Sequence, residues 1–305
     1  MVLSCLPHGR RIGFCKARAL SSTLCLHALL QRNTCRQERY GDGLWSQGGG
    51  MTCKRALTAY PELLSRTVAA PSWVMPGTVR DNAIFLSGEV DEVGLCFFET
   101  AACLAYGEND LPEHLADLPL GWHVHLPGDL PWCDGGAEAA VPALRLMDKV
   151  AFLGAHRAVL HPPVGFADGA ARLVAFVRAW EAAGRNPEDL CLENIRGEDL
   201  TGLWRTLCDL GCKVCLDMGH VLSYGQYGLL SLPGLSGRTS MLHANAPGPA
   251  GRHLSLDTLD GAGGGVGRAM CALLPDDAVV MVEVFDWEGV RRSLPLLETW
   301  FAAQR

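Results

Sequence analysis

The chain has 305 residues, of which 49% are hydrophobic and 19% are charged. A chain of this length and apolar content can bury a large core, which excludes wholesale disorder. Its formal net charge is -7, and an acidic protein is a poor default partner for duplex DNA unless metal ions supply positive charge. The sequence contains no uninterrupted apolar run of about 18 residues, the length that a membrane-spanning helix requires. We therefore expect a globular, cytoplasmic protein.

The first fifty residues differ in composition from the rest of the chain. They carry seven Arg or Lys but only two acidic residues, and no helical or strand periodicity is sustained. Met51 then opens a stretch that resembles an ordinary start. We therefore predict that residues 1–50 are a poorly ordered N-terminal extension and that residues 51–305 form a single domain.

Apolar runs and helical patterns alternate from residue 67 onward. Short buried runs predict strands at 67–74, 90–98, 120–126, 157–160, 190–192, 213–216, 240–242 and 278–284. Helical spacing of apolar residues predicts helices at 80–87, 137–152, 169–183, 200–210 and 287–303, and another within 254–274 that the Gly-rich stretch 261–267 interrupts. Eight strand–helix units in about 240 residues predict a (β/α)₈ TIM barrel. A doubly wound open sheet is the alternative, but no Gly-rich turn follows an early strand.

Side chains that can bind metal ions stand at the ends of six consecutive predicted strands. In chain order they are His123 and His125, His161, Glu193, Asp217 with His220, His243, and Glu283. In a (β/α)₈ barrel the carboxyl ends of all strands meet at one face, where active sites lie. Imidazole and carboxylate groups together suit Zn²⁺, Mn²⁺ or Fe²⁺. Any one of these residues is more commonly structural, and it is their recurrence that favours a metal site.

The number of donors indicates what chemistry such a site would perform. Three acids and several histidines exceed the needs of one tetrahedral ion, so two or three ions that share Glu193 would use them. Clustered divalent ions about 3.5–4 Å apart clamp a phosphoester and activate water near neutral pH. Carbonyl chemistry on a sugar at a single ion is the competing use of the same residues.

The order of these motifs resembles the xylose-isomerase-like barrel superfamily, and within it the endonuclease IV branch, AP endonuclease family 2. The matching motifs are His-Leu-Pro (125–127), Leu-His-Pro (160–162), Leu-Glu-Asn (192–194), Leu-Asp-Met-Gly-His (216–220), Leu-His-Ala-Asn (242–245) and Val-Glu-Val (282–284). That branch also has Asp-x-His after the seventh strand, and here the place reads Gly251-Arg252-His253. Because the Asp is replaced, the resemblance implies two divalent ions, with a third dependent on His253.

Longer phrases are similar to the cobamide-remodelling phosphodiesterases of the CbiR type. They lie at 91–99, 122–127 with 130–132, 192–195 and 282–287, and shorter ones lie at 224–226 and 246–248. This resemblance implies hydrolysis of the phosphodiester in the nucleotide loop of a corrinoid, with release of a cobinamide product. An abasic-site DNA endonuclease and a sugar isomerase or epimerase are the alternatives on the same barrel. The expected partner is a small-molecule corrinoid, with no nucleic acid and no membrane.

The resemblance also implies roles for individual residues. The implied metal ligands are His125, His161, Glu193, Asp217, His220, His243 and Glu283, and Glu193 is expected to bridge two ions. Glu193, His220 and His253 are the catalytic candidates. The expected substrate contacts are His123, Glu99, Trp132, Tyr224, Gln226 and Asn245. His123 and His125 share one face of a strand, so the sequence leaves open which of the two is the ligand.

Overall fold

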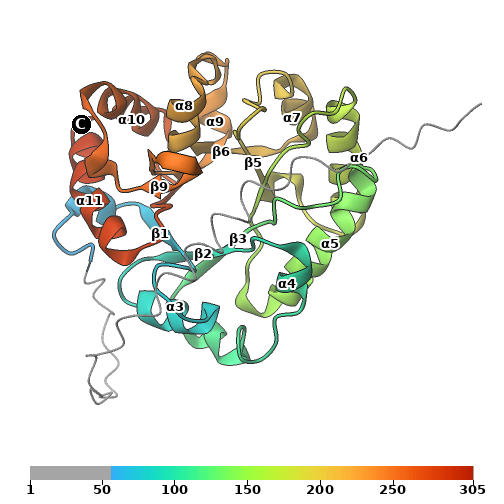
Figure 1. The fold of residues 1–305 in the computed structure, drawn as a ribbon, viewed down its shortest axis with the longest axis horizontal. Helices are drawn as coiled ribbons and strands as arrows, with labels where there is room; N and C mark the ends of the chain where they lie inside the picture. The colour runs from blue at the N-terminus through green and yellow to red at the C-terminus, as the bar shows by residue number, and fades with distance from the viewer. Residues whose placement is uncertain (1–55, 305) are drawn as a thin grey trace, which may run out of the picture. The chain divides into compact units, whose positions relative to one another are not determined.

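The computed structural model describes residues 56–304 of the protein, so the prediction for residues 1–50 lies outside the described residues. Eight parallel strands close into a barrel in the order β1-β10-β7-β6-β5-β4-β3-β2, with helices around it (Figure 1). The barrel strands are β1 (Thr67–Pro71), β2 (Glu92–Cys96), β3 (Gly121–His125), β4 (Ala158–Leu160), β5 (Leu190–Glu193), β6 (Lys213–Asp217), β7 (Thr239–His243) and β10 (Val279–Met281). The predicted (β/α)₈ barrel is confirmed.

The strands are buried on both faces, which explains why they appear in the sequence as continuous apolar runs and not as an alternating pattern. One face of each strand packs against the surrounding helices. The other faces the barrel interior, where a separate group of small, branched and sulfur-containing side chains forms a layer that we call the lower layer. Its members are Ala69, Cys96, Val159, Cys191, Cys215, Met241, Val279 and Met281.

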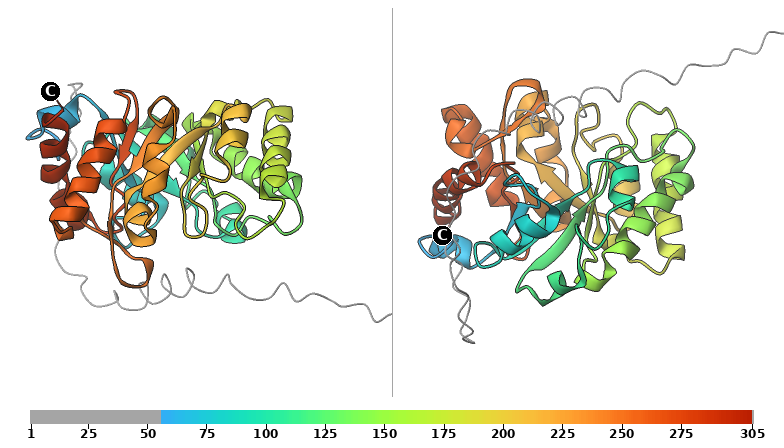
Figure 2. Two further views of the ribbon diagram at one scale, coloured as in Figure 1. Left: turned by 90° about the horizontal axis from the view of Figure 1, so that it is seen from above. Right: turned by 60° about the horizontal axis from the view of Figure 1, so that its bottom comes forward.

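Helices cover the outside of the barrel, as the side views show (Figure 2). They are α2 (Pro61–Leu64), α3 (Val79–Leu86), α4 (Thr100–Leu104), α5 (Gly136–Lys149), α6 (Gly169–Ala182), α7 (Trp204–Leu210), α8 (Met218–Tyr224), α9 (Leu235–Arg238), α10 (Gly261–Leu273) and α11 (Trp287–Ala302). The four that the sequence analysis did not predict, α2, α4, α8 and α9, have seven residues or fewer. Helices this short show too few turns for a helical period to be visible. No helix within residues 56–304 combines the length and apolar character needed to cross a bilayer.

The predicted interruption at 261–267 is wrong, because α10 runs without a break through its glycines. The Asp260 side chain caps the helix by accepting a hydrogen bond from the Gly263 amide at 2.7 Å. A Cβ atom at Gly267 would lie 2.4 Å from the Trp300 ring of α11. The glycine run therefore allows two helices to approach closely, and tertiary packing outweighs the low helix propensity of glycine.

A short antiparallel hairpin follows β7. It pairs β8 (Ala246–Pro247) with β9 (His253–Leu254). The turn between them passes through Ala250 in the left-handed region, with φ of 56°. The hairpin brings His253 back to the end of β10, where its Nδ1 atom lies 3.1 Å from the carbonyl oxygen of Glu283.

Candidate metal centre

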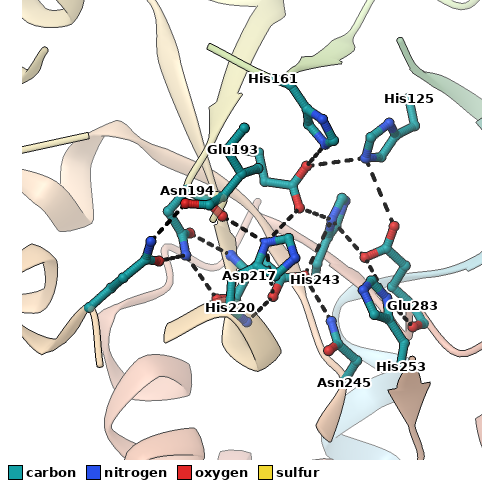
Figure 3. Close-up of polar contacts among 12 residues, drawn as sticks. His125, His161, Glu193, Asn194, Asp217, His220, His243, Asn245, His253 and Glu283 are labelled. Carbon is teal, nitrogen blue, oxygen red and sulfur yellow. Dashed lines mark hydrogen bonds and ion pairs between the residues drawn. The ribbon is translucent and has the colours of Figure 1, made fainter. Parts of the chain in front are cut away.

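Eight of the predicted site residues come together at the carboxyl ends of the barrel strands (Figure 3). We call them the strand-end cluster: His125, His161, Glu193, Asp217, His220, His243, His253 and Glu283. Six strands contribute, either by their last residue or by a residue just beyond it. His253 joins from the β8–β9 hairpin, and His220 from the first turn of α8. Residues far apart in the chain thus lie close to one another, as His125 Nε2 and Glu283 Oε1 do at 3.9 Å.

Glu193 lies at the centre of this cluster. Its Oε2 atom lies 3.1 Å from His125 Nε2 and 2.9 Å from His161 Nε2. Its Oε1 atom lies 3.3 Å from His243 Nδ1 and 3.7 Å from His220 Nδ1. The two carboxylate oxygens therefore face different pairs of histidines.

Glu283 and Asp217 form the other acidic side of the cluster. Glu283 Oε2 lies 3.2 Å from Nδ1 of both His243 and His253. Asp217 places Oδ1 3.6 Å from His220 Nδ1 and Oδ2 4.0 Å from His243 Nδ1. Both carboxyl groups are almost completely buried.

The donor atoms form three groups that could each hold a metal ion, because within each group they lie within 4.8 Å of one another. The groups are His125–Glu193–His243, Glu193–Asp217–His243–Glu283, and Asp217–His220–His253. Within the described chain, the buried Glu283 Oε2 lies close to two imidazole rings but makes no hydrogen bond of good geometry with either. An unsatisfied buried carboxylate oxygen is costly in a folded protein, and a cation would satisfy it. The residues present therefore fit a divalent metal.

Histidines keep two of the three carboxyl groups ionised despite their burial. Burial alone would raise the pKa of Glu193, but His243, His161 and His125 outweigh it and hold the pKa well below its ordinary value. The pKa of Glu283 is likewise held well below its ordinary value, because His243 and His253 outweigh burial. Such ionised carboxylates are ready to bind a cation.

The same surroundings raise the pKa values of His125, His243, His253 and Asp217. Burial would lower the pKa of His253, but the Glu283 carboxylate outweighs it and raises the pKa to about 9. The pKa of His125 is also raised, because Glu193 outweighs burial. Burial is the largest influence on Asp217 and raises its pKa. The ionised carboxylates thus favour positive charge beside them, which suits a metal cation.

Asp217 is held by the local structure of its own motif. Its Oδ1 atom accepts a hydrogen bond from the His220 amide at 2.5 Å, which caps the N-terminus of α8. Asn245 donates from Nδ2 to Asp217 Oδ2 at 2.8 Å. A Cβ atom at Gly219 would lie 1.9 Å from Asn245 Oδ1, so only glycine leaves room for this amide. The sequence Leu-Asp-Met-Gly-His thus positions a carboxylate, a histidine and the amide behind them.

The other predicted substrate contacts lie around or beneath the cluster. His123 is fully buried in the barrel interior, where Nδ1 lies 2.5 Å from Glu92 Oε1 and Nε2 lies 3.3 Å from Met281 Sδ. Asn245 is buried behind Asp217. Gln226 is also buried, and its Nε2 donates to the carbonyl oxygen of Ile195 at 2.8 Å.

The remaining three candidates are aromatic or acidic. Trp132 is buried, and its ring packs 5.2 Å from that of Phe176. Glu99 is exposed at the start of α4. Tyr224 is 39% exposed, and its ring centre lies 5.5 Å from that of His220. Tyr224 thus contacts the strand-end cluster through His220, and substrate contact by each of the three stays a prediction.

Two aromatic residues of the mouth were missed by the sequence analysis, namely Trp73 after β1 and Phe285 after β10. A signal for Phe285 was present, since it follows Glu283 by two residues and so continues the inward-facing side of its strand. Trp73 follows Ala69 of the lower layer by four residues and has the same parity. Both residues could have been predicted by continuing the inward–outward alternation of side chains for a few residues past the end of each strand.

Comparison with solved structures supports the fold. A D-tagatose 3-epimerase-like protein has a TM-score of 0.59 and 15% identity, with 78% of this chain and 98% of that chain covered. Endonuclease IV from Thermus thermophilus has a TM-score of 0.57 and 15% identity, with 78% and 99% covered. The fold is that of the xylose-isomerase-like TIM barrels.

A third similar structure is the IOLI protein with a binding zinc atom, which has a TM-score of 0.52 and 13% identity over 78% of this chain and 96% of that chain. At these identities the likeness concerns the fold. No family model matches the sequence. No curated protein matches it either. Proteins of this fold thus include epimerases and an endonuclease, and the choice between such reactions depends on the residues of the site.

Proposed function

We propose that the protein is a metal-dependent phosphodiesterase that hydrolyses the phosphodiester in the nucleotide loop of cobamides. The observation that carries this proposal is the geometry of Glu193, whose two carboxylate oxygens face separate pairs of histidines. A carboxylate in that position is suited to bridge two ions. Paired ions that share a ligand are the usual means by which proteins clamp both the attacking and the leaving oxygen of a phosphoester.

The ligand assignment follows from the contacts. His125 and His161 face Glu193 Oε2 and would hold one ion. Asp217, His243 and Glu283 each have a donor atom within 4.8 Å of one another and of a Glu193 oxygen, and would hold the other. His220 and His253, together with Asp217, either complete a third site or donate hydrogen bonds to the phosphate.

The reaction consumes one water molecule. Its oxygen forms a bond to phosphorus, one P–O ester bond breaks, and a proton ends on the released alcohol. Ions bound at the cluster would polarise the phosphate oxygens and lower the pKa of water. The protein's own contribution is to hold the ligands rigidly from below, as Asn245 and the cap of α8 do for Asp217. His253, at the edge of the cluster, would donate to a phosphate oxygen.

The choice of a phosphodiester over the alternatives rests on donor number and charge. Three carboxylates and five histidines in one cluster exceed what a single ion in a sugar epimerase would use. DNA cleavage would need basic groups to neutralise several phosphates, whereas this chain has a net charge of -7. The motif phrases shared with the cobamide-remodelling family then support a corrinoid as the substrate.

The direct test is to incubate the metal-loaded protein with adenosylcobalamin and pseudocobalamin and to analyse the products by mass spectrometry. We expect release of a cobinamide species that stops when a chelator is added, and the fragment mass identifies the broken bond. His161→Ala should reduce the rate. Its matched control is His114→Ala, since His114 is exposed in the 3-10 helix Glu113–Asp117, remote from the strand ends. Intact cobamides in the presence of fully metal-loaded protein would contradict the proposal.

A further inference from the structure

Two of the eight strand ends contribute no residue to the strand-end cluster within the described chain. These are the ends of β1 and β2, which lie next to each other in the barrel, and β1 also neighbours β10. The chain places aromatic side chains there instead. Trp73 follows β1, Phe98 follows β2, and Phe285 follows β10. We call these three half-buried residues the aromatic rim.

The three rings form a continuous row. The ring centres of Trp73 and Phe98 lie 6.4 Å apart, and those of Phe98 and Phe285 lie 5.8 Å apart. All three pack on the lower layer, so they stand above the barrel interior and not on its outer surface. The row reaches the strand-end cluster at His253, whose ring centre lies 5.5 Å from that of Phe285.

The rim is held in place by its neighbours. Trp73 Nε1 donates a hydrogen bond to the carbonyl oxygen of Cys96 at 3.2 Å, which fixes the indole against the end of β2. The buried Asn82 side chain accepts hydrogen bonds from the amides of Val74 and Met75, the two residues after Trp73. Side chains that are ordered before binding lose little entropy when a ligand packs on them.

The geometry points to a division of the mouth into two arcs. The arc from β3 to β7 carries imidazole and carboxylate groups, and the arc of β1 and β2 carries aromatic groups. β10 lies at the boundary and carries one of each, Glu283 in the cluster and Phe285 in the aromatic rim. We propose that the aromatic rim is a substrate subsite that holds a large, apolar-edged ring system on one side of the scissile phosphate. This inference rests on the proposed function and specifies it, because the corrin half of a cobamide is such a ring system and the nucleotide half is polar.

The extent of the rim favours the corrin over the nucleotide base. Three rings on three adjacent strand ends offer an apolar edge longer than one stacked base would cover. The polar ribose and phosphate suit the opposite arc, where His161 is partly exposed and Tyr224 presents its phenol beside His220. The substrate would therefore lie across the mouth with its corrin over β10, β1 and β2.

Binding of the two substrate halves tests the subsite without requiring hydrolysis. Chelator-treated protein is titrated with cobinamide and, separately, with the ribosyl-dimethylbenzimidazole phosphate half, and bound ligand is measured by ultrafiltration. We expect Phe98→Ala and Phe285→Ala each to raise the Kd of cobinamide roughly tenfold, and Phe98→Leu to raise it less. Phe152→Ala is the control, because Phe152 is 38% exposed in the 3-10 helix Ala151–Leu153, which precedes β4 at the opposite end of the barrel.

The outcomes separate this inference from the proposed function. Rim-dependent cobinamide binding without cobamide hydrolysis would keep the subsite and overturn the phosphodiesterase. Hydrolysis with cobinamide binding that the rim variants leave unchanged would overturn the subsite. Loss of nucleotide binding alone in the rim variants would also overturn it, since the rim would then hold the base. Failure of the wild-type protein to bind cobinamide would overturn it as well.

Discussion

His123 and His125 lie two residues apart on β3, and both side chains point into the barrel, yet their surroundings differ completely. His125 stands at the mouth, with its Nε2 atom 3.1 Å from one carboxylate and 3.9 Å from another. His123 lies one layer deeper, between Glu92 and Met281. Burial lowers the pKa of His123 even though Glu92 acts against it, whereas carboxylates outweigh burial and raise the pKa of His125.

The comparison teaches that depth along the strand decides what a barrel histidine can do. At the level of His125, carboxylates from several strands converge, and a cation can find four or more donors. At the level of His123 the neighbours are mostly thiols, thioethers and aliphatic groups, and a single carboxylate pairs with the ring. Changes at the mouth should therefore alter metal binding and activity, and changes in the lower layer should alter stability.

The largest effect is expected for Glu193→Gln. The amide keeps the size of the side chain but removes the charge that faces four histidines. Loss of a residue that only hydrogen-bonds to a metal ligand typically reduces metal affinity or activity by about 10–100-fold. Loss of the central ligand itself should therefore reduce activity by more than that. Steady-state hydrolysis and circular dichroism are the measurements, and the spectrum should keep its native form. An active Glu193→Gln enzyme would contradict the claim that metal binding and activity depend on the carboxylates at the level of His125.

A smaller effect at the mouth is expected for Gly219→Ala. The new methyl group would meet Asn245 Oδ1 and displace the amide that holds Asp217. We expect metal affinity to fall by about 10–100-fold, and Asn245→Ala to have a similar effect. Competition with a chelator of known affinity measures both. If Asn245→Ala binds metal as the wild type does, the amide does not position Asp217.

Gly265→Ala is the matched control for that substitution. Gly265 also lies within a helix, and in the described part of the chain nothing stands within 4 Å of the Cβ position. Alanine there should leave metal affinity unchanged and stabilise the protein by about 0.5–1 kcal/mol, because glycine is the poorer helix former. Chemical denaturation measures the gain. A drop in metal affinity in this variant would mean that any added methyl group disturbs the mouth.

Substitution of His123, which contacts the lower layer through Met281, should reduce stability and leave metal binding unchanged. His123→Gln removes the imidazole that faces Glu92 and the contact to Met281, and leaves the half-buried carboxylate with Arg157 at 3.9 Å as its remaining charged partner. We expect a loss of about 1–3 kcal/mol in the free energy of unfolding, measured by urea denaturation, with metal affinity unchanged. Glu92→Gln should cost a similar amount. A His123→Gln protein of native stability would contradict the structural role that we assign to the lower layer.

Much of the fold and the position of the site follow from the sequence because barrel topology is restrictive. Once eight strand–helix units are recognised, the residues at the strand ends must meet at one face, so His125, Glu193, Asp217 and His243 could be grouped without coordinates. The sequence could not assign His123 to a deeper layer, because two residues of the same parity look alike in a strand pattern.

Features that depend on close contact between segments far apart in the chain could not be predicted from the sequence. The continuity of α10 through its glycines depends on the Trp300 ring of a neighbouring helix. The position of Asn245 behind Asp217 depends on a glycine in another motif, Gly219 of α8. The aromatic rim depends on which strands are neighbours in the closed barrel, and its members are far apart in the chain.

The most direct test of this account is the metal content of three proteins, measured by inductively coupled plasma mass spectrometry after equal loading and desalting. The wild type and His123→Gln should both carry two or three ions per chain, and Glu193→Gln should lose at least one. Equal metal content in all three proteins, or equal loss from both variants, would contradict the claim that the metal centre lies at the strand ends and is organised around Glu193.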